Sequence, residues 1–197
     1  MDYDSIVLAS ASERRSRLLG QIGVRHEPVA ADVDESLRAG ESPDDYVERL
    51  AGSKASAVVA ARGGRPDRPV LAADTTVALV DRIFGKPADE ADCVAMLTAL
   101  AGRRHAVLTA VALWHDGQLR RSLSTSYVTF RRIAPEECRR YWESGEPAGK
   151  AGGYAIQGLG AVFVERLEGS FSGVMGLPLF ETARLLDAAG VRRWQFA

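Results

Sequence analysis

Short apolar runs alternate along the chain with segments whose apolar residues recur at helical spacing. Residues 6–9 and 70–73 are continuously apolar, which is typical of strands buried on both faces. Residues 26–30 are a candidate strand between them. Helical spacing begins after Ser12, whose hydroxyl can accept a hydrogen bond from a free backbone N–H, and again after Ser42-Pro43, a favourable helix start.

The second half of the chain continues this alternation. Asp116-Gly117 lies between two long apolar segments, which is a strong signal for a β-hairpin. The pattern predicts further helices at 91–100, 135–143 and 179–189, and strands at 77–80, 105–114, 119–133 and 161–167. Strands that alternate with helices, with one clear hairpin, predict an α/β fold built on a mixed sheet flanked by helices.

Two glycine-rich segments, 144–160 and 169–177, interrupt this pattern. Glycines allow a backbone to approach a ligand closely, and they equally allow tight turns, so composition alone leaves both readings open. Gln157 is the one side chain of the first segment with an amide that could read the edge of a nucleobase.

Composition limits the classes of function. The 197 residues include 25 basic and 26 acidic side chains, so the chain lacks the overall positive charge of a nucleic-acid-binding protein. Cys93 and Cys138 stand alone, which is typical of buried cysteines in a reducing compartment. The first residues do not resemble a signal peptide and no apolar run reaches membrane-spanning length, so we expect a cytoplasmic protein that binds neither membrane nor nucleic acid.

The turn after the first predicted strand carries candidate anion-binding groups. Ser10 and Ser12 supply hydroxyls, and Arg14 and Arg15 follow in the first helical turn. Cations are disfavoured at the positive end of a helix dipole, so their presence there suggests that an anion such as phosphate is expected. An ordinary solvated helix start would show the same pattern.

Acidic and basic residues elsewhere could complete a phosphoryl-transfer site. Asp74 interrupts an apolar run, where an unpaired carboxylate would be costly, and we interpret it as functional. Glu35 lies in an acidic loop, Lys54 lies beside the inward face of the second helix, and Lys86 lies on a stiff Gly-Lys-Pro loop. Carboxylates, lysines and a phosphate-binding turn suit magnesium-assisted chemistry at a phosphoryl group.

Several blocks of sequence, in this order, resemble the Maf family. They are Leu8–Arg15, Asp34-Glu35, Arg49-Leu50-Ala51 with Lys54, Ala73-Asp74-Thr75, Gly85-Lys86-Pro87, Lys150–Gly158 and Gly173–Pro178. The resemblance extends from residue 6 to about residue 189. One departure is Gly149, where many members carry an acidic residue, so no role of that acid is inherited.

The resemblance implies a nucleoside triphosphate pyrophosphatase with the fold of the Maf and inosine triphosphate pyrophosphatases. It implies one domain over residues 1–197 with two lobes and the active site in the cleft between them. The reaction would convert a nucleoside triphosphate to the monophosphate and pyrophosphate with a divalent cation, Mg²⁺ or Mn²⁺. Arg14, Thr75 and Gln157 match the dTTP/UTP subfamily, with CTP and modified pyrimidine nucleotides as further candidates.

The resemblance also implies a role for each candidate residue. Asp74 would be the central acid, as base or metal ligand, with Glu35 as the second base or metal ligand. The phosphates would be held by Ser10, Ser12, Arg14, Arg15, Lys54 and Lys86. Base choice would rest on Thr75, Gln157 and Arg14.

Several alternatives stay open at this point. An inosine or xanthosine triphosphate pyrophosphatase, or one acting on methylated GTP, would use a related fold. A nucleotidyltransferase would need a turn richer in glycine than this one. A nucleotide-binding regulator of septum formation would need no catalysis. Family members often form homodimers, and the sequence leaves the oligomeric state open.

Overall fold

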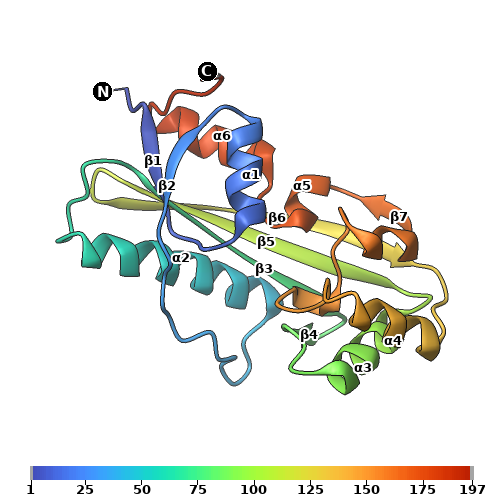
Figure 1. Cartoon of the computed structure of the whole chain (residues 1–197). Helices are drawn as coiled ribbons and strands as arrows, with labels where there is room; N and C mark the ends of the chain where they lie inside the picture. Colours follow the sequence, from blue (N-terminus) through green and yellow to red (C-terminus); the bar gives the residue numbers. More distant parts are fainter. Residues whose placement is uncertain (1, 196–197) are drawn as a thin grey trace. The chain divides into compact units, whose positions relative to one another are not determined.

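A computed structural model describes residues 2–195 of the chain (Figure 1). The strands are β1 (Ser5–Leu8), β2 (Arg25–Pro28), β3 (Val70–Leu79), β4 (Arg82–Phe84), β5 (Arg104–His115), β6 (Gln118–Phe130) and β7 (Val164–Glu168). The α-helices are α1 (Glu13–Gln21), α2 (Pro43–Ala61), α3 (Glu90–Leu100), α4 (Pro135–Glu143), α5 (Phe171–Met175) and α6 (Leu179–Ala188). Two 3₁₀ helices, η1 (Ala151–Gly153) and η2 (Leu159–Phe163), lie in the first glycine-rich segment.

The described strands form one seven-stranded sheet in the order β2-β1-β3-β5-β6-β7, with β4 paired to β3. β1 pairs in parallel with β2 and with β3, whereas β4 and β7 pair antiparallel with their neighbours. The predicted α/β class with a mixed sheet and flanking helices is therefore confirmed.

The chain divides into two compact units. The first contains Met1–Asp74, Thr109–Ser124 and Gly176–Ala197, and the second contains Thr75–Leu108 and Thr125–Met175. The boundaries fall inside β3, β5 and β6, so these three strands contribute residues to both units.

In the first unit, helices cover both faces of the β1–β3 region, with α1 and α6 on one side and α2 on the other (Figure 1). The core side chains include Ile6, Leu8 and Leu71 from the predicted apolar runs and Leu50 from α2. The two ends of the chain meet where Tyr3 forms a parallel bridge with Val191.

In the second unit, α3 and α4 pack against each other and against one end of the strands. Phe130, Tyr154 and Phe163 form edge-to-face aromatic contacts in this core. His105 is buried among them, and its Nε2 lies 3.0 Å from the Tyr154 hydroxyl oxygen. The glycine-rich segment 144–160 is therefore attached to the core through Tyr154.

Several local predictions need correction. Asp74 does not interrupt its strand, because β3 continues through it to Leu79. Ser12 occupies the N-cap position, but its side chain makes no capping bond to the described backbone, and its own N–H donates to Ser10 Oγ instead. The strand predicted at 161–167 starts only at Val164, and the segment 169–177 contains α5.

None of the helices within residues 2–195 is long and apolar enough to cross a membrane.

Candidate active site

Lys54 lies between two carboxylates in the first unit. Its Nζ is 2.6 Å from Asp74 Oδ1 and 2.6 Å from Glu35 Oε1. Asp74 points from the centre of β3, Lys54 from α2, and Glu35 from the long segment that precedes α2. The side chains of Lys54 and Asp74 are 11% and 10% exposed, whereas that of Glu35 is 39% exposed. Lys54 therefore forms one buried ion pair, with Asp74, and a second ion pair with the more exposed Glu35.

Burial dominates the electrostatics of Asp74. It raises the pKa of this carboxyl above its ordinary value, although the neighbouring charges of Lys54 and then Arg15 oppose the shift. A carboxylate with a raised pKa holds a proton more strongly than an exposed aspartate. Asp74 therefore combines a shielded position with enhanced basicity, which are properties that general bases require.

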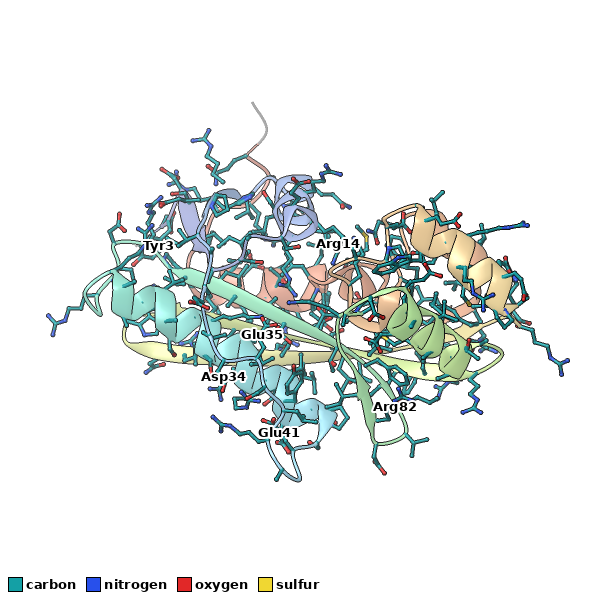
Figure 2. The ribbon with its side chains drawn as sticks, turned by 60° about the horizontal axis from the view of Figure 1, so that its bottom comes forward. Tyr3, Arg14, Asp34, Glu35, Glu41 and Arg82 are labelled. Atoms are coloured by element: carbon teal, nitrogen blue, oxygen red, sulfur yellow. The ribbon has the colours of Figure 1, made fainter. Side chains whose placement is uncertain are left out.

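Ser10 and Arg15 are joined beside this group. Arg15 Nη1 donates to Ser10 Oγ over 3.3 Å, and Arg15 Nε donates to the carbonyl of Gly176 over 2.8 Å. Burial lowers the pKa of Arg15, and the charge of Asp74 opposes that change. Arginine stays charged at physiological pH despite such shifts. The turn that leads into α1 therefore presents a fixed cation and a hydroxyl, with Ser12 and Arg14 at the same helix start (Figure 2).

The segment that carries Glu35 is held by side chains that are not among the predicted site residues. Asp34 accepts hydrogen bonds from both the N–H and the hydroxyl of Ser36. The Tyr46 hydroxyl donates to the carbonyl of Glu35 over 2.9 Å. Figure 2 shows Asp34 and Glu35 on this segment beside α2. Glu35 is therefore fixed by its backbone as well as by Lys54.

Arg49 supports the same segment one turn further along α2. Its Nη2 donates to the Ser36 carbonyl over 3.0 Å, and its Nε and Nη2 both bind the carboxylate of Glu41. The hydrogen bonds from Arg49 lower the pKa of Glu41 to about 2. Arg49 belongs to a block that resembles the Maf family, but local sequence gave no signal of these partners, because they depend on how the loop folds back.

Three predicted site residues lie in the second unit. Thr75 directly follows Asp74 in β3 and is partly buried, whereas Lys86 and Gln157 are exposed on loops. The Gly152 N–H donates to the Gly85 carbonyl over 3.0 Å, so the loop of Lys86 is tied to the segment that leads to Gln157. Gly152 also packs against Val77 so closely that an added Cβ would lie 2.9 Å from its side chain.

A separate cavity in the first unit has a volume of about 400 Å³. Its lining includes Tyr3, Arg65, Arg68, Trp114 and His115. None of the ten predicted site residues lines it.

The acid pair offers oxygen ligands of the kind that a divalent metal ion takes. Within the described residues no group of three or more His, Cys, Asp or Glu side chains could hold one. Asp74 and Glu35 nevertheless converge on one point, at Lys54 Nζ, and offer the oxygen donors that Mg²⁺ prefers. Mg²⁺ is commonly held by one or two carboxylates, and water and substrate phosphates complete its shell. The donor set fits a divalent cation shared with a phosphorylated substrate.

The fold and the site together define an α/β protein with two carboxylates and a lysine gathered near a serine–arginine turn. These are the residue types of an enzyme site that handles a charged substrate. Sequence comparison then identifies the family. A family model described as Maf-like protein matches residues 5–189, and the chain belongs to this family.

Relatives match over almost the full length. A dTTP/UTP pyrophosphatase from Cupriavidus pinatubonensis is 52% identical, covering 96% of this chain and 99% of its own. Proteins with the same name from Cupriavidus metallidurans and Saccharophagus degradans are 53% and 51% identical, covering 94% and 96% of this chain and 97% and 91% of their own. A solved structure of the Staphylococcus aureus Ham1 protein is 15% identical with a TM-score of 0.46, and covers 93% of this chain and 96% of that chain.

Proposed function

We propose that this chain hydrolyses dTTP and UTP to the nucleoside monophosphate and pyrophosphate. Relatives that are more than half identical to it carry the name of this activity. The structural observation that carries the proposal is the buried pair of Asp74 and Lys54, extended by Glu35. A cytoplasmic location is part of the proposal, since free nucleotides such as dTTP and UTP are available there.

In the proposed reaction, water attacks the α-phosphorus of the triphosphate. The bond between that phosphorus and the oxygen leading to the β-phosphorus breaks, and pyrophosphate leaves. The proton of the attacking water passes to the carboxylate of Asp74. Support for this role comes from the buried position of Asp74 and from its raised pKa, which makes it a stronger base than an exposed aspartate.

The phosphates are held by hydroxyls and cations from the turn before α1 and from two lysines. Arg15 and Ser10 already form a fixed pair, whose guanidinium charge and hydroxyl are groups of the kind that bind phosphate oxygens. Ser12, Arg14, Lys54 and Lys86 complete the proposed set. Their common role is to neutralise charge on the leaving pyrophosphate.

A divalent cation, Mg²⁺ or Mn²⁺, is part of the proposal. Asp74 and Glu35 would hold it, since their carboxylates converge on one point. When bound, the cation neutralises charge that develops on phosphate oxygens in the transition state.

Arg14, Thr75 and Gln157 set the choice of base in this proposal. The exposed amide of Gln157 offers both a donor and an acceptor. Thymine and uracil present the complementary acceptor and donor on one edge, which an apolar residue could not read. The same amide could also pair with cytosine or with a modified pyrimidine, so these triphosphates are further candidates to be tested beside dTTP and UTP.

The test is a substrate panel. Purified protein is incubated with Mg²⁺ and dTTP, UTP, CTP, GTP or ITP, and the pyrophosphate and monophosphate released are measured. We expect equal amounts of both products, with dTTP and UTP turned over fastest. Release of no pyrophosphate from any nucleotide would refute the activity, and a preference for ITP or GTP would refute the pyrimidine specificity.

A further inference from the structure

The segment Ala155–Gly160, which carries Gln157, is held at its far end by Glu146. Glu146 Oε2 accepts a hydrogen bond from the Leu159 N–H, and Oε1 accepts one from the Gly160 N–H, both over 2.9 Å. Burial raises the pKa of Glu146, but its hydrogen bonds to Tyr141, Gly160 and Leu159 outweigh this and the net direction is downward. The side chain is therefore a charged acceptor, which makes these bonds stronger than neutral ones.

Tyr141 holds the near end of the same segment. Its hydroxyl donates to Glu146 Oε1 over 2.7 Å and accepts from the Ala155 N–H over 3.1 Å. The ring is buried at the inner face of α4 and packs edge-to-face on Phe163, with the ring centres 5.1 Å apart. One side chain anchored in the core thus connects both ends of the segment.

The contacts leave no room for a Cβ atom at two positions of the segment. A Cβ added to Gly158 would lie 2.0 Å from Glu146 Oε2, and one added to Gly160 would lie 2.6 Å from the Tyr141 hydroxyl. A side chain at either position would force Glu146 or Tyr141 to move away from the segment. The glycine content of the segment serves this contact as well as its turns.

We propose that Glu146 and Tyr141 are positioning residues that fix Gln157 for reading the pyrimidine base. Gln157 is exposed between Ala155, held by Tyr141, and Leu159, held by Glu146. Neither positioning residue needs to touch the substrate. This inference rests on the proposed function, because it assigns the loop a purpose only if Gln157 selects the base.

Glu146→Gln tests the proposal with almost no change in size. The amide nitrogen of glutamine cannot accept a hydrogen bond, so one of the bonds from Tyr141, Leu159 or Gly160 is lost and the rest lose their charge. A displacement near 1 Å at a positioned group can cost about 100-fold. We expect the ratio of kcat/KM for dTTP over GTP to fall at least about tenfold, mainly through KM for dTTP.

The matched control is Glu143→Gln, which removes the same charge at an exposed position three residues earlier. Tyr141→Phe is the second variant, because it deletes one hydroxyl and leaves the aromatic packing intact. Hydrogen exchange of the Leu159 and Gly160 amides is measured in all proteins without substrate. We expect faster exchange in Glu146→Gln and wild-type exchange in Glu143→Gln.

A double variant shows whether the effect passes through Gln157. In a Gln157→Ala background, Glu146→Gln should change the dTTP/GTP ratio by less than about twofold, because the two effects are coupled. If Glu146→Gln accelerates exchange but leaves the ratio unchanged in the wild-type background, the loop contact is merely structural and the proposal is overturned. Unchanged exchange of the Leu159 and Gly160 amides in Glu146→Gln would also overturn the proposal, because Glu146 would then not hold the loop.

Failure of the proposed function would look different from these results. A wild-type protein that releases no pyrophosphate refutes the activity itself, whereas the exchange of the Leu159 and Gly160 amides still reports whether Glu146 holds the loop. Circular dichroism of each variant confirms that it is folded before rates are compared.

Discussion

We expect Lys54 to stabilise the buried carboxylate of Asp74 in the folded protein. Its Nζ lies 2.6 Å from Asp74 Oδ1, and both side chains are about nine-tenths buried. At an effective dielectric constant of about 20, two unit charges at this distance attract each other by about 6 kcal/mol before desolvation is counted. Replacing Lys54 with methionine removes this attraction and leaves Asp74 buried without it.

Breaking a buried ion pair by removing one partner costs about 3–5 kcal/mol. We therefore expect Lys54→Met to lower the free energy of unfolding by about that amount at pH 8. Glu35 adds little to the loss, because its side chain is 39% exposed and water screens it.

The loss should depend on pH in a definite direction. Burial already raises the pKa of Asp74, and removing Lys54, the largest opposing influence, raises it further. A carboxyl whose folded pKa lies above its unfolded value favours folding at low pH, and this contribution is lost as pH rises through the folded pKa. The deficit in the free energy of unfolding of Lys54→Met relative to wild type should therefore be smaller at pH 5 than at pH 8. It should shrink by about 1.4 kcal/mol for each unit by which the variant raises the pKa of Asp74 within this range.

Urea unfolding followed by circular dichroism at pH 8 and pH 5 measures this deficit. The double variant Lys54→Met with Asp74→Asn is the matched control, because it has no carboxylate left to titrate at position 74 and should show a smaller deficit that is nearly independent of pH. A deficit for Lys54→Met below about 1 kcal/mol, or one equal at both pH values, would refute the reasoning.

Three further predictions test other parts of the molecule. Asp74→Asn should lower kcat about 100- to 10,000-fold while circular dichroism stays that of wild type, and full activity would exclude Asp74 as the base. Tyr46→Phe removes the hydrogen bond to the Glu35 carbonyl. It should lower the free energy of unfolding in urea by about 0.5–1.5 kcal/mol and reduce kcat several-fold. An unchanged kcat would show that this bond does not support catalysis. Burial lowers the pKa of His105 to about 4, so stability should be full above pH 6.5 and fall toward pH 4 by up to about 3 kcal/mol. His105→Gln, which can keep a hydrogen bond to Tyr154, should remove this loss of stability at low pH. If urea unfolding shows the same loss in both proteins, His105 is not its cause.

The elements were predictable from sequence because burial dictates the apolar pattern. The apolar runs 6–9 and 70–73 are buried and largely coincide with β1 (Ser5–Leu8) and with the first part of β3, as their continuous hydrophobicity indicates. The failure at Asp74 has a physical cause. The sequence shows a costly charge in an apolar run, but its compensating partner is Lys54, 20 residues away on another element. Local sequence therefore suggested a break where the strand continues.

Some residues of the candidate site could likewise be predicted from the sequence, whereas others could not. The resemblance to the Maf family pointed to Asp74, Glu35 and Lys54, and the structure brings these three together. Glu146 and Tyr141 were missed, because the glycines of the loop are visible in the sequence but the side chains that approach them are not. Supporting contacts of this kind depend on tertiary structure and have no local pattern.

Hydrolysis of dTTP in ¹⁸O-labelled water, by wild type and by Asp74→Asn, tests the proposed reaction most directly. Water attack at the α-phosphorus predicts that mass spectrometry finds the label in dTMP and none in pyrophosphate, at a rate that falls at least about 100-fold in Asp74→Asn. Label in pyrophosphate, release of dTDP with inorganic phosphate, or an unchanged rate in Asp74→Asn would contradict it.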